Sequence, residues 1–403
     1  MNLVLAAAFY FSLVAGGLLP FTETEPIYVV AKSVSLIFFL CVVTSVLKRR
    51  SFAIPALTFL GIAVPLLLWS ALRSSDYTYA LQKFDAIAFG TVGAAALFYR
   101  LRERVGVASA FDKLLLVALA VLLATLGYKL AYGFWDRSIR FFLNGPIVFG
   151  WLMGSMCLIA LHRLITTGAP RYFLAAMVFF AATVWPMSKG AIVALLASMA
   201  MLAVLNLRRS AFSRIALLMA PLLLLAALLF SSGSVLPLND TRLAAFSRIL
   251  TNEIDKSDEG SIVTRLDMLD QTAELIRKNY ALGVGLANWQ TASGSQFEYP
   301  HNVYAELAAE FGLPIAVLLL LALATMFGRV PNETRVLALF FLIASGFSGD
   351  ASYLRFPLAF ILASWRLNWS AHETPAAHHR ARHQRLRHFG QAGISDFGGT
   401  RHG

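Results

Sequence analysis

Apolar residues occur in long runs along most of this chain, and short charged clusters separate the runs. An α-helix needs about twenty residues to cross the roughly 30 Å of hydrocarbon in a bilayer, and the runs have about that length. The pattern therefore predicts an all-α polytopic membrane protein with about twelve transmembrane helices. The approximate spans are 2–20, 27–47, 52–71, 79–99, 111–131, 141–162, 171–187, 189–207, 211–231, 302–328, 334–349 and 352–369.

The composition agrees with this fold class. Hydrophobic residues make up 58% of the 403 residues and charged residues only 14%, which is too apolar for an ordinary soluble protein. Both cysteines, Cys41 and Cys157, lie inside hydrophobic runs, so neither a disulfide framework nor a thiolate metal site is predicted. The first run has no basic region before it and no small-residue cleavage site, which indicates a retained helix rather than a signal peptide.

The distribution of lysine and arginine predicts the orientation. Alternate connections are rich in cations, and the positive-inside rule makes these connections cytoplasmic. An even number of spans then places both termini in the cytoplasm and residues 232–300 outside. The net charge of +12 is explained largely by this topology, and nucleic-acid binding is not predicted. The cytoplasmic cations are Lys48, Arg49, Arg50, Arg100, Arg102, Arg104, Arg163, Arg171, Arg208, Arg209, Arg214, Arg329 and Arg335.

Four regions follow from the spans. Residues 1–231 carry transmembrane helices 1–9, residues 232–300 form a large external loop, and residues 301–369 carry helices 10–12. Residues 370–403 contain several histidines, arginines and glycines, a composition that cannot build a core, so we expect a disordered, basic cytoplasmic tail. The tail histidines lack a ligand spacing, which makes a metal site the less favoured alternative.

The external loop is much longer than the other connections, and such loops usually carry function. From Ser261 to Asn279 the pattern predicts an amphipathic helix that lies on the membrane surface or against the bundle. Its apolar stripe is Ile262, Leu266, Leu269, Ala273 and Ile276. Arg265 lies beside this stripe and near the positive end of the helix dipole, which favours an anion site. The alternative is an arginine that only extends to the membrane interface.

Farther along, Gly283 and Gly285 permit a close turn, and Pro300-His301-Asn302 begins the next helix. His301 is the one histidine of eight that is predicted on the external side. A helix N-terminus disfavours the protonated imidazole, so His301 is a candidate general base near pH 7. The alternative is an interfacial histidine without a catalytic task.

These residues resemble the signature of the O-antigen ligase and polymerase superfamily. In that signature an arginine-led helix is followed by a Gly-x-Gly turn and by a His-Asn helix that ends in Glu-x-Gly. The corresponding segments here are Thr264–Asp267, Leu282–Gly285, His301–Tyr304 and Glu310–Pro314. Ser188-Lys189-Gly190-Ala191 also resembles the family's Ser-Arg-Gly-Ala element, although lysine keeps the charge and loses the two-pronged hydrogen bonding of arginine.

The resemblance implies a GT-C type glycosyltransferase with one large periplasmic loop, in the bacterial inner membrane. The donor would be O-antigen linked to undecaprenyl diphosphate, and the acceptor would be the lipid A-core oligosaccharide. His301 would take the proton from an acceptor hydroxyl, Arg265 would hold the donor diphosphate, and such a mechanism would invert the anomeric centre. The chain contains no Asp-x-Asp pair, so we expect no metal and no other cofactor.

Further residues are candidates for substrate binding. Asp350 either orients His301 or contacts the acceptor, and the alternative is that it pairs with Arg355. Arg137, Arg140, Arg242, Arg248 and Arg355 are either phosphate ligands or simple interfacial charges. The substrate-binding set that we predict is Lys189, Gly285, Asn302, Tyr304, Asp350, Arg355 and Arg242.

Three other functions remain open. An O-antigen polymerase shares the signature and the donor, and a protein-targeting oligosaccharyltransferase shares the chemistry. A transporter or flippase for the lipid-linked sugar belongs to a different class, for which internal repeats and interrupted helices with midplane polar residues are expected. The gathering of charges in the external loop favours surface chemistry over transport.

Overall fold

The computed structural model describes residues 1–134, 136, 139–141, 145–206 and 262–365. The regular secondary-structure elements in these residues are all helices, which confirms the all-α fold class. The predicted span 211–231, the loop residues before Ile262, and the tail 370–403 lie outside the described residues.

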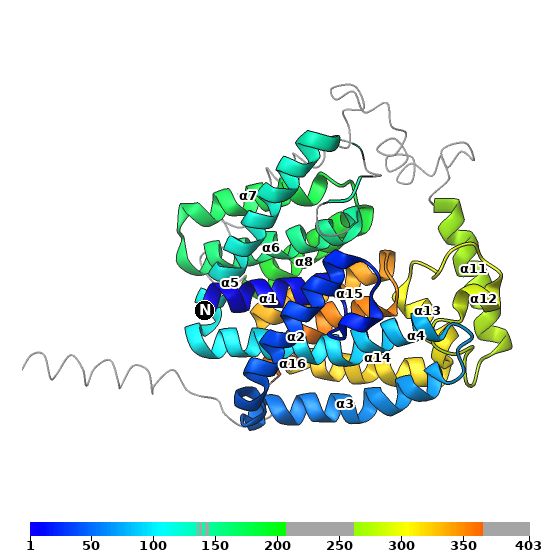
Figure 1. Ribbon diagram of the computed structural model, residues 1–403. Coiled ribbons are helices and arrows are strands. Elements are labelled where there is room, and N and C mark those ends of the chain that lie inside the picture. Colours follow the sequence, from blue (N-terminus) through cyan, green and yellow to red (C-terminus); the bar gives the residue numbers. More distant parts are fainter. Residues whose placement is uncertain (135, 137–138, 142–144, 207–261, 366–403) are drawn as a thin grey trace, which may run out of the picture. The chain divides into compact units, whose positions relative to one another are not determined.

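The helices follow the apolar runs closely. The first part of the chain forms α1 (Asn2–Ala15), α2 (Pro26–Leu47), α3 (Arg50–Ala71), α4 (Tyr77–Asp85), a π-helical turn (Ala86–Gly90), α5 (Thr91–Tyr132), α6 (Pro146–Thr167), α7 (Pro170–Val184) and α8 (Lys189–Asn206). The second part forms α11 (Ile262–Lys278), α12 (Trp289–Ser293), α13 (Val303–Phe311), α14 (Leu313–Gly328), α15 (Asn332–Phe347), the 3-10 turn η4 (Ala351–Leu354) and α16 (Arg355–Ser364). Figure 1 shows α11 and α12 beside α13.

Six helices among the described residues are long and apolar enough to cross a membrane, and three shorter ones are also apolar. The chain is therefore a polytopic α-helical membrane protein, while the total of about twelve spans stays a prediction. One continuous helical stretch, Tyr77–Tyr132, is 56 residues long. It kinks at Gly106, where φ is 76°, and the predicted spans 79–99 and 111–131 lie on either side of this kink.

The predicted single span 302–328 is wrong. The structure divides it into α13 and α14 at Gly312, which has a φ of 86°. A Cβ atom at this position would lie 2.6 Å from the carbonyl oxygen of Ala281, so glycine permits both the left-handed backbone and the close approach. The break separates the short α13, which carries candidate site residues, from the apolar α14.

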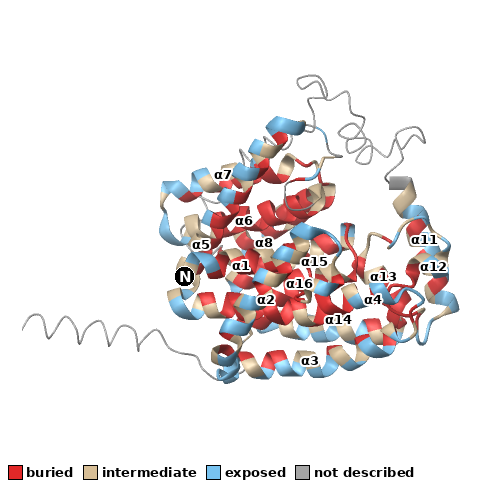
Figure 2. Cartoon of the chain, viewed as in Figure 1, coloured by how far each residue is buried: buried red, intermediate tan, exposed pale blue. Residues whose placement is uncertain are grey.

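Aromatic side chains fill the core where α1, α5 and α16 meet. Phe9 stacks on Phe98 with 5.1 Å between ring centroids, and Phe360 lies edge-on to Phe98 at 5.2 Å. Figure 2 shows buried positions along these helices and pale exposed positions along α3. Leu57 and Ile62 of α3 are 60% and 58% exposed. We interpret such exposed apolar side chains as facing lipid.

Candidate functional site

His301 lies directly before α13. Its ring packs edge-on against Tyr299, with 4.6 Å between ring centroids, and its buried Nδ1 atom has no hydrogen-bond partner in the described part of the chain. Burial and, second, the charge of Arg265 lower the pKa of His301 to about 4, whereas the Asp350 carboxylate raises it. The imidazole is therefore neutral near pH 7, and burial is the largest cause.

Arg265 lies in the first turn of α11 and is half-buried. Because its charge lowers the pKa of His301, the structure brings the two side chains within electrostatic range of each other. Burial lowers the pKa of Arg265 and Tyr299 opposes this shift, but a guanidinium keeps its charge at neutral pH. A fixed cation and a neutral imidazole thus share Tyr299 as a neighbour.

The predicted apolar stripe of α11 coincides only in part with the buried face, which Ile276 adjoins. Leu266 is 53% exposed, whereas Met268 and Leu275 are buried in a cluster with Trp289. Thr272 lies on the same buried face, and its Oγ1 accepts a hydrogen bond of 2.8 Å from Trp289 Nε1. Trp289 of α12 therefore covers the face of α11 that carries Met268 and Leu275, and this face is not the one with the most regular apolar spacing.

Asp350 is the N-cap of η4 and is 5% exposed. Its carboxylate accepts hydrogen bonds from the Tyr79 hydroxyl at 2.8 Å and from the backbone N–H of Ser352 at 3.1 Å. Ser352 Oγ donates to Asp350 and accepts from Arg355 Nη1. Asp350 thus acts electrostatically on His301 and is linked to Arg355 through Ser352, while orienting His301 and contacting the acceptor stay predictions.

Arg355 is 4% exposed and is held on several sides. Its Nε donates to the Leu13 carbonyl oxygen at 2.9 Å, and Nη1 donates to the Ser352 carbonyl oxygen at 2.9 Å. The guanidinium lies 4.9 Å from the ring centroid of Tyr353. This environment excludes a simple interfacial charge, since the side chain is inside the protein.

Asn302 and Tyr304 position α13. The Asn302 side-chain oxygen accepts hydrogen bonds of 3.0 Å from the N–H groups of Tyr304 and Ala305, as an N-cap does. The Tyr304 hydroxyl donates to the Leu342 carbonyl oxygen of α15 at 2.6 Å, and burial raises the pKa of Tyr304 to about 12. These contacts hold His301 in place, and substrate contacts by the two residues stay predictions.

The Gly-x-Gly turn packs between the C-terminal end of α3 and α13 and is hydrogen-bonded to both. Gly285 has a φ of 100° and a Cβ atom there would lie 3.0 Å from the carbonyl oxygen of Arg73. Its N–H donates to the Glu310 carbonyl oxygen at 3.0 Å, and the Arg73 guanidinium donates to the carbonyl oxygens of Leu282 and Gly283 at 2.7 and 2.6 Å. The observed task of Gly285 is close backbone packing, and its substrate contact stays a prediction.

Lys189 begins α8 and is half-buried. A Cβ atom at the next residue, Gly190, would lie 2.6 Å from Cβ of Phe347. The Lys189-Gly190 pair therefore packs closely against the end of α15, three residues before Asp350. Its role at a phosphate stays a prediction.

Among the remaining arginine candidates, Arg140 lies within the described residues. Arg140 forms a two-pronged ion pair with Glu25, with N–O distances of 2.9 Å, and so behaves as an interfacial charge. Arg137, Arg242 and Arg248 lie outside the described residues.

Three non-glycine residues in the described part of the chain have positive φ. They are Met187 at 50°, Ala287 at 61° and His301 at 55°. His301 is itself a predicted site residue. Met187 lies two residues before Lys189, and Ala287 lies two residues after Gly285. Strained backbone of this kind costs about 1–3 kcal/mol per residue and concentrates at functional sites, which supports a functional role for each of the three signature elements.

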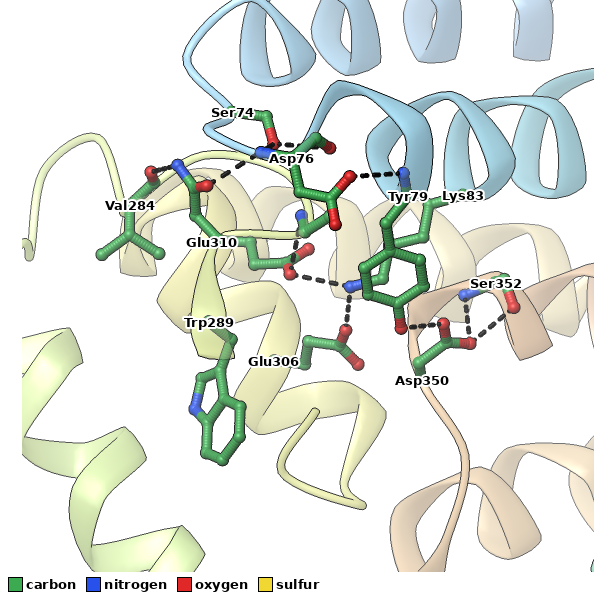
Figure 3. Close-up of polar contacts among 12 residues, drawn as sticks. Ser74, Asp76, Tyr79, Lys83, Val284, Trp289, Glu306, Glu310, Asp350 and Ser352 are labelled. Atoms are coloured by element: carbon green, nitrogen blue, oxygen red, sulfur yellow. Dashed lines mark hydrogen bonds and ion pairs between the residues drawn. The ribbon is translucent and has the colours of Figure 1, made fainter. Parts of the chain in front are cut away.

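Sequence reasoning missed a buried charge network behind His301. Lys83 of α4 forms ion pairs with Glu306 and with Glu310, the latter at 2.8 Å, and all three side chains are at most 1% exposed. Figure 3 shows the Lys83 ammonium between the two carboxylates and the Tyr79 hydroxyl directed at Asp350. The Lys83 ammonium lies 4.6 Å from the Tyr79 ring centroid, so the network continues to Asp350.

A signal for this network was present in the sequence. Lys83 is a lone cation within a predicted membrane span, and Glu306 and Glu310 are four residues apart on one helical face. Ionisable residues inside spans are costly and usually paired. Burial raises the pKa of both glutamates, and the charge of Lys83 opposes this shift.

A model of the O-antigen ligase family matches residues 174–320. The matched range includes Lys189, Arg265 and His301, whereas Tyr79, Lys83 and Asp350 lie outside it. No curated protein matches the chain significantly.

Proposed function

We propose, from the match of residues 174–320 to the O-antigen ligase family, that the chain transfers O-antigen polysaccharide from undecaprenyl diphosphate to the lipid A-core oligosaccharide. The observation that carries this proposal is the neutral His301 within electrostatic range of the Arg265 charge. The pair supplies a proton acceptor and an anion ligand, which are the two groups that transfer from a diphosphate requires.

In the proposed step, the acceptor hydroxyl loses its proton to His301 as its oxygen bonds to the anomeric carbon of the donor sugar. The bond between that carbon and the diphosphate oxygen breaks, and undecaprenyl diphosphate leaves with the bonding electrons. Arg265 stabilises the leaving diphosphate through charge-assisted hydrogen bonds, which contribute about 1.5–3 kcal/mol each. Lys189 is the second proposed phosphate ligand, and cationic side chains serve in place of a metal.

Binding of the donor would also adjust His301. Without bound donor, the His301 imidazole has a pKa of about 4, which makes it a weak base. A diphosphate on Arg265 offsets the guanidinium charge, which is one of the two causes of that low pKa, so the donor raises the basicity of His301. The base would then gain strength only when the donor is present.

The orientation belongs to the same proposal. The site would face the periplasm from the inner membrane, and both termini would lie in the cytoplasm, as the distribution of cations indicates. The donor lipid then lies in the outer leaflet with its diphosphate at the level of Arg265 and Lys189.

A lipopolysaccharide gel of a deletion strain tests the function. We expect uncapped lipid A-core together with accumulated long O-antigen on undecaprenyl diphosphate. Lipid A-core capped by single repeats would instead identify a polymerase and overturn the ligase proposal. Normal capping in the deletion strain would remove the protein from this pathway altogether.

Purified variants test the residue roles. His301→Ala should lower the transfer rate about 10²- to 10⁴-fold because a positioned base is lost, and Arg265→Ala should lower it by at least about tenfold through the lost phosphate bonds. The matched control is Arg277→Ala, an exposed arginine on the same helix. Wild-type rates in either site variant would remove that residue from the mechanism.

A further inference from the structure

A cavity of about 390 Å³ lies next to the His301 site. The end of α1, the first turns of α2 and α4, the segment before His301 and the η4–α16 junction surround it. Tyr299 and Asp350 link the cavity to the His301 site. Both line the cavity, and Tyr299 interacts electrostatically with Arg265, whereas Asp350 interacts electrostatically with His301. Arg265 and Lys189 are not among the residues that line the cavity.

The charge of the cavity wall disfavours a diphosphate. Three cations line it, Lys32, Lys83 and Arg355, together with three acids, Glu23, Glu298 and Asp350. Lys32 is already paired with Glu23 at 2.8 Å and with the buried Asp85 at 3.4 Å, and Lys83 is paired with Glu306 and Glu310. Both lysines are thus neutralised by carboxylates of the wall or behind it, and the wall itself carries as many acids as cations, so it has no excess positive charge to hold a dianionic ligand.

The same wall suits a ligand that is rich in hydroxyl groups. Tyr28, Tyr79, Tyr299 and Tyr353 line it, and tyrosine offers both a ring face and a polar tip. Gln82 and Asp350 add amide and carboxylate groups. Arg355 also lines the cavity, and its Nη2 atom has no acceptor among the described residues, whereas its other nitrogens are bonded to protein.

We infer that this cavity binds the terminal sugars of the acceptor oligosaccharide, with the reacting hydroxyl at its Asp350 and Tyr299 side, beside His301. The volume lies within the range of roughly 300–1,000 Å³ that is usual for small-molecule sites, so the cavity takes the end of the oligosaccharide and not the whole molecule. Donor diphosphate and acceptor sugar then occupy opposite sides of His301. This inference rests on the proposed function.

Cysteine protection tests the inference. Glu298→Cys at the exposed rim and Gln82→Cys on the wall are made with Cys41→Ser, since Cys41 is the exposed native thiol and Cys157 is buried. The probes are core oligosaccharide released from lipopolysaccharide and undecaprenyl diphosphate. At ten times its dissociation constant, the oligosaccharide should slow the reaction of both cysteines with a small polar thiol reagent about tenfold. Undecaprenyl diphosphate should leave the rates unchanged.

The matched control is Glu274→Cys on the exposed face of α11, which neither probe should protect. Protection by undecaprenyl diphosphate, or no protection by the oligosaccharide, overturns the inference. The KM for lipid A-core should rise in Gln82→Ala while the KM for the donor stays constant, and an unchanged acceptor KM also counts against it. Failure of the proposed function is distinct, because the wild-type protein would then transfer no O-antigen in the same assay.

Discussion

At the scale of single residues, the chemistry depends on the charge state of His301. Two causes lower its pKa to about 4, burial first and the Arg265 charge second, and the Asp350 carboxylate raises it. Replacing Arg265 by a neutral residue removes a lowering cause, so the pKa must rise. Replacing Asp350 by asparagine removes the raising cause, so the pKa must fall.

The reaction of His301 with diethyl pyrocarbonate measures this directly, because only the neutral imidazole reacts and catalytic activity is not required. In the wild type we expect the rate, followed by peptide mass spectrometry, to stay high down to a pH of about 4. In Arg265→Gln the midpoint should move to higher pH. Arg277→Gln is the matched control, and a midpoint shared by all three proteins would contradict the electrostatic coupling of Arg265 and His301.

Lys83 shows how one missing cation affects a buried network. Lys83→Met leaves two buried carboxylates without a counter-charge, so it should lower the free energy of unfolding by about 3–5 kcal/mol. Thermal unfolding in detergent measures the loss. Lys278→Met removes the exposed i,i+4 pair with Glu274 and should change the unfolding temperature little.

A second variant separates charge from packing at this network. Adding Glu306→Gln and Glu310→Gln to Lys83→Met removes the uncompensated charges, so part of the lost stability should return. If the triple variant were less stable than Lys83→Met, the ion pairs would not be the cause of the loss.

At the scale of elements, the turn from Leu282 to Asn288 holds α13, and thus His301, in position. Its Val284 N–H donates to the Ala309 carbonyl oxygen at 2.8 Å, and the Asn288 side-chain amide donates to the Arg73 carbonyl oxygen at 2.8 Å. Glu310 Oε1 accepts from the Ala287 N–H at 2.9 Å. The turn is thereby bonded to the α3–α4 connection on one side and to α13 on the other.

Glycine substitutions test this role. In Gly283→Ala the new Cβ atom would lie 2.5 Å from the Glu310 carbonyl oxygen, so α13 must move and both stability and transfer rate should fall. Gly294→Ala is a matched control, because its φ of 69° resembles the 67° of Gly283 while no atom lies within 4 Å of the new Cβ. It should show only the cost of a left-handed alanine, about 1–2 kcal/mol. Equal effects of the two substitutions on transfer would contradict the positioning role of the turn.

The sequence predicts the bounds of the helices better than it predicts the tertiary contacts between them. The amphipathic helix predicted from Ser261 to Asn279 is observed as Ile262–Lys278, because helix bounds depend on local pattern. Its most buried face, with Met268 and Leu275, is not the predicted stripe, because the contact with Trp289 is tertiary and no local pattern contains it. The Lys83–Glu306 pair joins residues 223 positions apart, and no local pattern contains such a pairing.

At the scale of the whole molecule, segments that are distant in sequence contribute to the candidate site. Residues 174–320 match the family and contain Lys189, Arg265 and His301. Tyr79 and Asp350 lie outside this range, yet they are hydrogen-bonded to each other at 2.8 Å, and Asp350 acts electrostatically on His301. Residues on both sides of the family-matched range therefore contribute to the candidate site.

The distribution of cations over the molecule gives the last prediction. Arg49 pairs with Glu103 at 2.7 Å and Arg163 with Asp112 at 3.0 Å, at helix ends that the positive-inside rule assigns to the cytoplasm. Arg104→Cys at such an end should therefore react with a membrane-impermeant maleimide only after cell lysis. Glu274→Cys on α11 should react in intact spheroplasts, since the proposed transfer takes place outside the cytoplasm. With Cys41→Ser in both proteins, the reverse labelling pattern would place His301 and Arg265 in the cytoplasm, where a periplasmic transfer to lipid A-core could not occur.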